Sequence, residues 1–173
     1  MPAGLRLLFL ASLLAAAACA AAHVLTFADI AFYPILAAVP LLFVIFPLVL
    51  WKFRKIPRKN FFSEIFGDIP RSLKIGGLVL FVYTFANFFI CLDLLDGGNA
   101  RRLPDNRLVL SAKDKVIRDL TPAQFRHAQA VEVRLMTGHL LAFFAFAAFA
   151  VHACWLKSGP AMADARIRKS GAF

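Results

Sequence analysis

The stretch that decides the fold runs from residue 121 to residue 155 and reads TPAQFRHAQAVEVRLMTGHLLAFFAFAAFAVHACW. It begins as a helix should: Thr121 is a favoured N-cap, Pro122 is tolerated in the first turn, and Gln124 has the spacing of a capping box. Its first part is polar, whereas residues 135–156 carry no formal charge. At about 1.5 Å per residue, those residues cover a hydrocarbon core of roughly 30 Å. The sequence therefore predicts one continuous helix that crosses a membrane and extends out of it.

The chain as a whole is too apolar for a soluble fold of its size. Hydrophobic residues make up 61% of its 173 residues, which is more than such a fold can bury. The net charge of +10 comes from basic residues beside hydrophobic segments, without interleaved stacking aromatics, and this pattern argues against nucleic-acid binding. Cys19, Cys91 and Cys154 lie in apolar segments without metal-site spacing and read as small buried residues.

Four hydrophobic segments are candidates for membrane spans, at residues 4–22, 30–51, 75–92 and 135–156. The first is an Ala/Leu run behind Arg6 that equally resembles a cleavable signal peptide, whose removal would leave three spans. We expect an all-α, polytopic membrane protein. Residues 1–173 would form one membrane domain, a compact four-helix bundle whose last helix continues outside the membrane.

Three prolines fall in the second span. Pro34 is in its first turn and costs little, whereas Pro40 and Pro47 are expected to remove interior backbone hydrogen bonds and to kink the helix. Membrane helices tolerate such prolines when neighbouring groups satisfy the freed carbonyls. We therefore read these prolines as structural features.

The two long connectors differ in character. Residues 52–74 are strongly basic and contain apolar residues at helical spacing, which predicts a short interfacial helix and binding of anionic lipid. These apolar residues are Phe61, Phe62, Ile65, Phe66 and Ile69. Residues 93–134 form a mixed outer segment, in which residues 108–110 are expected as a short strand and residues 113–119 as a brief helical or irregular piece.

The distribution of charge predicts the orientation. With residue 6, the connector 52–74 and the tail on one side, that side carries 12 Lys/Arg against 3 acids, and the other carries 8 against 7. Positive residues mark the cytoplasmic face. We therefore expect a multi-pass protein of a bacterial inner membrane with both termini in the cytoplasm.

Histidines are the residues that suggest a cofactor. His139 and His152 lie in one span, but thirteen residues separate their side chains by roughly 140° and about 20 Å, which excludes a shared haem. His23 and His139 are instead expected at one depth near the outer surface. That pair is the candidate site for haem b or a quinone. The alternative is that His139 only reaches headgroup water from a shallow position.

Small residues predict how the last span packs. Gly138, Ala142, Ala145 and His152 fall on one arc of the helix, where a seam of small residues allows close contact between spans. We expect this seam to face the third span, where Asn87 can donate an interhelical hydrogen bond. The acids near the outer helix ends are expected as caps or as partners of Arg134; they are Asp29, Asp93, Asp96 and Glu132.

No nucleotide-binding loop, nucleophile elbow or zinc-protease motif is present in the sequence. We therefore expect a non-catalytic membrane protein without a cofactor, an accessory or assembly partner of other membrane subunits. One alternative is a redox protein that binds haem b or quinone. The other is a small transporter or channel, although the prolines of the second span have no counterparts in the fourth, as an internal repeat would require.

Overall fold

The computed structural model describes residues 3–54, 67, 69–113 and 115–157. These residues are mostly helical, and the α-helices are α1 (Ala3–Leu25), α2 (Val39–Phe53), α4 (Arg71–Leu94) and α5 (Pro122–Lys157). Two short 3₁₀ helices connect α1 to α2, η1 (Thr26–Ala28) and η2 (Tyr33–Ala38). A small sheet lies between α4 and α5 in the sequence, with strands β1 (Asn99–Arg102), β2 (Leu108–Ala112) and β3 (Lys115–Asp119).

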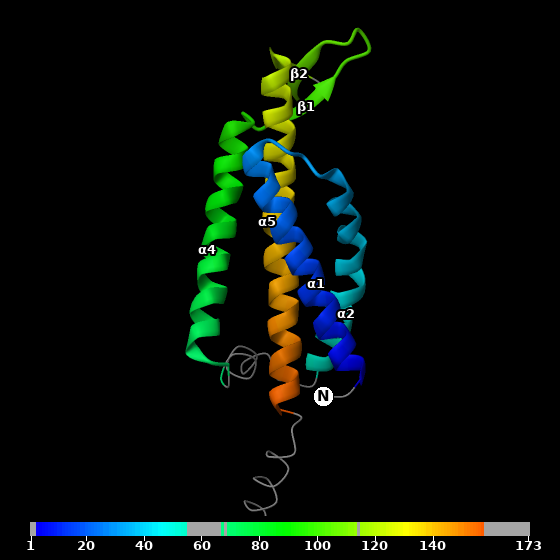
Figure 1. The fold of residues 1–173 in the computed structure, drawn as a ribbon, viewed down its shortest axis with the longest axis vertical. Helices are drawn as coiled ribbons and strands as arrows, with labels where there is room; N and C mark the ends of the chain where they lie inside the picture. The colour runs from blue at the N-terminus through cyan, green and yellow to red at the C-terminus, as the bar shows by residue number, and fades with distance from the viewer. Residues whose placement is uncertain (1–2, 55–66, 68, 114, 158–173) are drawn as a thin grey trace, which may run out of the picture.

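Four helical segments of the described chain are long and apolar enough to cross a membrane. They are Ala3–Ala28, Tyr33–Trp51, Arg71–Leu94 and Pro122–Ala153. Each predicted span lies within or largely overlaps one of them, although most of these helices extend past the predicted limits. The extension is greatest in α5, whose first turns rise beyond the other helices toward the sheet (Figure 1).

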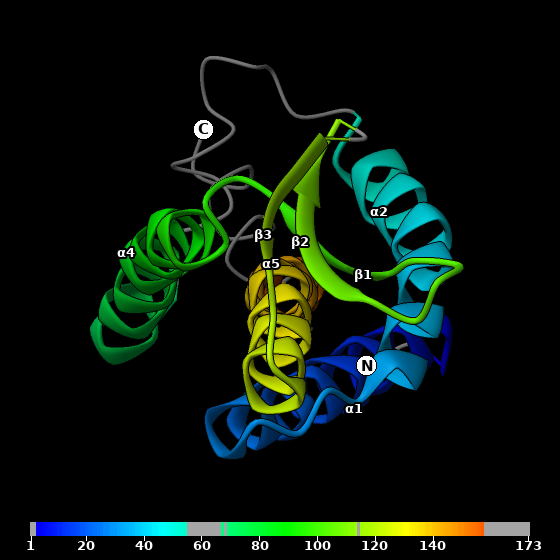
Figure 2. The same ribbon diagram turned by 90° about the horizontal axis from the view of Figure 1, so that it is seen from above.

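Helix α5 is the central element. Helices α1 and α2 pack on one side of it and α4 packs on the other (Figures 1 and 2). The main apolar core lies between α1, α2 and α5, where Cys19, Ile45 and Phe144 are buried. The other three helices thus surround α5 unevenly, because α4 has extensive contacts with α5 but not with α1 or α2.

The N-terminus of α5 has the predicted capping box. The backbone N–H of Thr121 donates to Gln124 Oε1 at 2.9 Å, and the backbone N–H of Gln124 donates to Thr121 Oγ1 at 3.3 Å. Two otherwise unpaired N–H groups are satisfied in this way. This part of the prediction is confirmed because it depends only on local spacing.

The prediction that Pro40 interrupts a helix is wrong. The second span begins as the 3₁₀ helix η2, and Pro40 falls in the first turn of α2. There its missing N–H costs nothing, and the N–H of Val39 donates to the carbonyl of Leu36 in the tighter 3₁₀ pattern. Pro47 does lie inside α2.

The outer segment contains more strand than expected, so the fold is not purely all-α. Strand β2 includes the predicted residues 108–110, but it is the middle strand of an antiparallel sheet of order β1-β2-β3. Residues 115–119, expected to be helical or irregular, form β3. The correction has a local cause: Lys113 adopts a left-handed φ of 47° that turns the chain back, and Val116 and Ile117 are β-branched.

The sheet rests on the nearby ends of two helices. Leu110 of β2 and Leu120, just after β3, cluster with Cys91 of α4, with Leu95 just after α4, and with Val131 of α5. These contacts form a second apolar cluster, separate from the main core. The predicted interfacial helix lies almost entirely outside the described residues; of its five apolar positions only Ile69 is described, and it is buried just before α4.

Candidate functional site

A largely buried polar network joins three helices at the end of the spans nearest the sheet. His23, in the last turn of α1, is the residue at its centre. Its Nδ1 lies 2.9 Å from Thr137 Oγ1 on α5, and its Nε2 lies 2.5 Å from the hydroxyl of Tyr83 on α4. One imidazole therefore contacts both neighbouring helices.

The hydrogen bonds of Thr137 assign the tautomer of His23. The Thr137 hydroxyl donates to the carbonyl of Val133 at 2.7 Å, so its single proton is already used. It must accept from His23, which places the imidazole proton on Nδ1. In a neutral imidazole of this tautomer, Nε2 accepts from the Tyr83 hydroxyl.

Arg134 extends the network along α5. Its Nε donates to Thr26 Oγ1 at 3.1 Å and its guanidinium donates to the Thr26 carbonyl at 3.0 Å. The guanidinium also lies 4.1 Å from the centre of the Phe27 ring, in cation–π contact. Asn87 Nδ2 of α4 donates to the Arg134 carbonyl at 3.3 Å. Arg134 thus fastens the turn after α1 to α5, and Asn87 fastens α4 to the same place.

The expected partnership between Arg134 and the acids of the outer helix ends is not formed. Glu132 instead accepts a hydrogen bond from the backbone N–H of Ala100 in β1 and one of 3.3 Å from the hydroxyl of Tyr33. Asp29 pairs with His127 at 2.7 Å. Glu132 and Arg134 are two residues apart and therefore point to nearly opposite sides of α5. Sequence spacing could have excluded their pairing, but it could not have indicated Ala100.

His139 and His152 lie outside this network. Nδ1 of His139 donates to the carbonyl of Leu135 at 2.8 Å, and its ring meets Phe88 of α4 edge-on at 5.3 Å. The His152 ring lies 6.0 Å from that of Phe9 in α1. The structure thus gives His23 and His139, the predicted cofactor pair, separate partners.

The predicted packing seam has two different parts. A Cβ on Gly138 would lie 2.7 Å from Asn87 Nδ2 and 3.5 Å from His23 Cε1, so α5 has close neighbours in both α4 and α1 at this point. Ala142 and Ala145, one and two turns further on, line an open cavity between α4 and α5. His152 faces α1, where Phe9 is its aromatic neighbour.

The network is closed on itself. Within the described residues, no buried side-chain nitrogen or oxygen lacks a hydrogen-bond partner, and no three metal-ligating side chains converge. His23 and Thr137 are buried in this network, whereas Tyr83 at its edge remains 38% exposed. No family model, curated protein or solved structure matches this chain. The geometry is that of a clamp that fixes α1, α4 and α5 at one level.

Outside the spans, the sheet carries exposed charge pairs. Arg107 donates to the Asp105 carboxylate at 2.8 Å, and this bond holds the pKa of Asp105 below its ordinary value. Arg118 lies 3.6 Å from Asp96. Because these groups are exposed, the pairs fix the geometry of the loops and contribute little to stability.

Proposed function

We propose that this protein is a non-catalytic, multi-pass membrane protein that holds a small β-sheet outside the membrane as a docking platform for another subunit of a membrane complex. The observation that carries this proposal is the tie between Glu132 and Ala100. It fixes β1 to the central helix and leaves the opposite strand of the sheet, β3, at a free edge.

The rigid side of the sheet is built from one charged and one apolar contact. The Glu132 carboxylate receives the Ala100 N–H and the Tyr33 hydroxyl, so β1, η2 and α5 meet at one side chain. Behind it, Leu110 of β2 and Val131 of α5 are almost fully buried. These contacts hold the sheet directly against the membrane-spanning helices, without a flexible linker between them.

The free side of the sheet is β3. All five of its residues are exposed, and Val116 and Ile117 remain 46% and 42% exposed. In the part of the chain that the structure describes, β3 pairs with β2 only. Natural proteins usually protect such edges. An extended segment of a partner subunit that adds as a fourth strand would satisfy the edge and cover both side chains.

The location follows from charge. We infer a bacterial inner membrane with both termini in the cytoplasm and the sheet on the outer side. The support is that α1 begins and α5 ends at the end of the molecule opposite to the sheet (Figure 1). Arg54 and Arg71, at the ends of α2 and α4, lie at that same end.

The test is site-specific photo-crosslinking in native membranes. A benzoylphenylalanine at Val116 should give one discrete adduct, and the same probe at Arg102 should not, because Arg102, although exposed, lies on the strand that is bonded to Glu132 of α5. Mass spectrometry should place the adduct on an extended segment of another membrane protein. Adducts of equal yield from both positions, adducts to lipid, or none at Val116 would refute the platform.

A further inference from the structure

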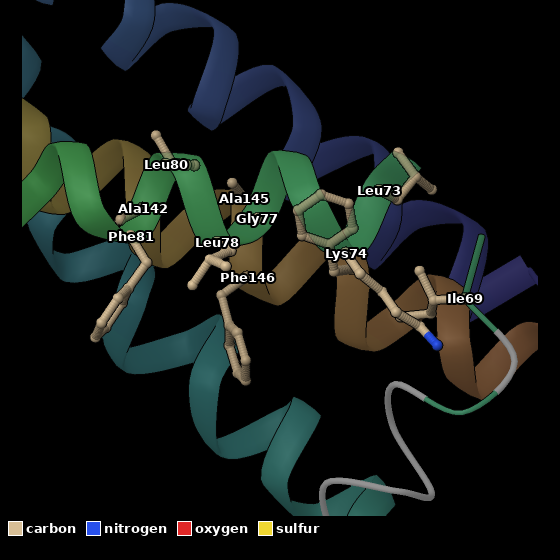
Figure 3. Close-up of a pocket in the computed structure, with 11 residues that line it drawn as sticks. Ile69, Leu73, Lys74, Gly77, Leu78, Leu80, Phe81, Ala142, Ala145 and Phe146 are labelled. Carbon is tan, nitrogen blue, oxygen red and sulfur yellow. The ribbon is translucent and has the colours of Figure 1, made fainter. Parts of the chain in front are cut away.

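An apolar hollow between α4 and α5 has no place in the docking platform. It has a volume of about 420 Å³. Its walls come from Gly77, Leu78 and Phe81 of α4 and from Ala142, Ala145 and Phe149 of α5 (Figure 3). Every one of these side chains is apolar or absent, so the cavity is a trough for hydrocarbon.

The trough exists because α4 is fastened to α5 at its outer half only. Asn87 bonds to the Arg134 carbonyl at 3.3 Å and Phe88 packs on His139. All the buried residues of α4 are Thr84, Asn87 and Cys91. Before Thr84 the two helices separate toward Arg71 (Figure 1). The small residues Gly77, Ala142 and Ala145 leave the gap unfilled.

One end of the trough is cationic. Lys74 lines the cavity beside Ile69, at the end away from Phe81 and Ala142 (Figure 3). Its Nζ donates to the Gly67 carbonyl at 3.2 Å, which leaves two of the three ammonium protons for another acceptor. Arg71 lies one turn earlier on the same helix and is exposed.

An apolar trough with a cation at one end matches an amphipathic anion. From Lys74 to Phe81 the helix rises about 10 Å, a depth that belongs to acyl chains once Lys74 is at the headgroup level. We propose that this trough binds one acyl chain of an anionic phospholipid, with the lipid phosphate held by Lys74 and Arg71.

The experiment uses the full-length protein in detergent, titrated with dioleoyl phosphatidylglycerol or dioleoyl phosphatidylcholine and followed by native mass spectrometry. The acyl chains are identical, so the comparison isolates the headgroup. We expect phosphatidylglycerol to bind about fivefold more tightly for each engaged cation. Lys74→Gln should reduce that preference about fivefold, whereas Lys113→Gln, in the outer sheet, should leave it unchanged.

Two adjacent glycines provide the matched test of the trough. Gly77 lines it, and a Cβ there would meet Phe149 Cε2 at an unstrained 3.9 Å, whereas a Cβ on Gly76 would meet nothing within 4 Å. Gly77→Leu should therefore abolish the bound lipid, and Gly76→Leu should not. Equal affinity for both lipids, unchanged binding in Gly77→Leu, or a dimer that Gly77→Leu removes would overturn the proposal. Lys74→Gln gives an independent answer should Gly77→Leu fail to fold.

Discussion

The carboxylate of Glu132, on α5, accepts the backbone N–H of Ala100, thirty-two residues earlier in β1. This bond closes the open edge of β1 with a side chain instead of a strand. Ala100 is half-buried and Glu132 lies beside Tyr33 and Leu95 around a small cavity, where a hydrogen bond to a charged acceptor is stronger than at the surface. The orientation of the sheet relative to the spans therefore depends on this carboxylate together with the apolar cluster around Leu110 and Val131.

Replacing that carboxylate should release the sheet. Glu132→Ala should accelerate hydrogen exchange at the Ala100 amide and lower stability by about 1–3 kcal/mol, since a partly buried N–H loses its acceptor. Tyr33→Phe is the control, because it removes only the 3.3 Å bond from the tyrosine hydroxyl. Exchange-detected mass spectrometry of the peptide that includes residues 99–102 makes the comparison. Unchanged exchange in Glu132→Ala would show that the sheet is held by its apolar contacts alone.

The clamp at His23 should appear as coupling between helices. His23→Ala and Thr137→Val each remove one partner of a hydrogen bond between α1 and α5. The double variant should therefore lose less unfolding free energy than the two single variants lose together. We expect a coupling free energy of about 0.6–1.7 kcal/mol, the range of interhelical hydrogen bonds in membranes. His152→Ala with Thr137→Val is the control pair and should be additive. If the losses of unfolding free energy are additive in both pairs, His23 and Thr137 are neighbours whose contact contributes no coupling free energy.

Close packing at Gly138 distinguishes it from Gly76. A side chain at Gly138 would meet Asn87 and His23, whereas Gly76 faces open space. Gly138→Leu should therefore lower the melting temperature in detergent by several degrees, as overpacking costs about 1–3 kcal/mol. Gly76→Leu should leave it unchanged or raise it, because glycine disfavours helices. Similar melting temperatures for the two variants would contradict the close approach of α4 and α5.

The cofactor alternative is open to a spectroscopic test. Tyr83 occupies the Nε2 lone pair of His23 in this structure, so we expect purified protein from haem-replete cells to lack an absorbance band between about 400 and 430 nm, where haem b absorbs. A band that disappears in His139→Ala would show instead that the protein binds haem and that His139 is needed to hold it.

Local signals in the sequence were enough to predict the four long helices. The capping box at Thr121 and the uncharged run that follows it determine where α5 begins and why it is long. Of the sheet, only residues 108–110 were predicted as strand, and β1 was missed because it reads Asn-Ala-Arg-Arg and has no apolar alternation. It forms through pairing with β2 and through Glu132, which are non-local contacts that no window of sequence contains.

The sequence prediction paired histidines by their expected depth and had no information on the direction of their side chains. Matching levels across the membrane paired His23 with His139, whereas the structure pairs His23 with Thr137. Thr137 and His139 are two residues apart on α5, so they differ by only about 3 Å along the helix axis but by roughly 200° in the direction of their side chains. Depth can be read from hydropathy, but the face that a residue presents depends on which helix packs beside it. The partners Tyr83 and Thr137 therefore became visible only in the assembled fold.

The account rests on a membrane topology that puts the sheet and the basic helix ends on opposite sides, and accessibility labelling tests this most directly. In a variant with all three cysteines replaced by alanine, Arg102→Cys in β1 and Gly67→Cys before α4 are both exposed positions. In intact cells an impermeant maleimide should label Arg102→Cys alone, and it should label both after lysis. Labelling of Gly67→Cys but not of Arg102→Cys in intact cells would reverse the orientation, and labelling of both would show that the chain does not separate these positions across a membrane.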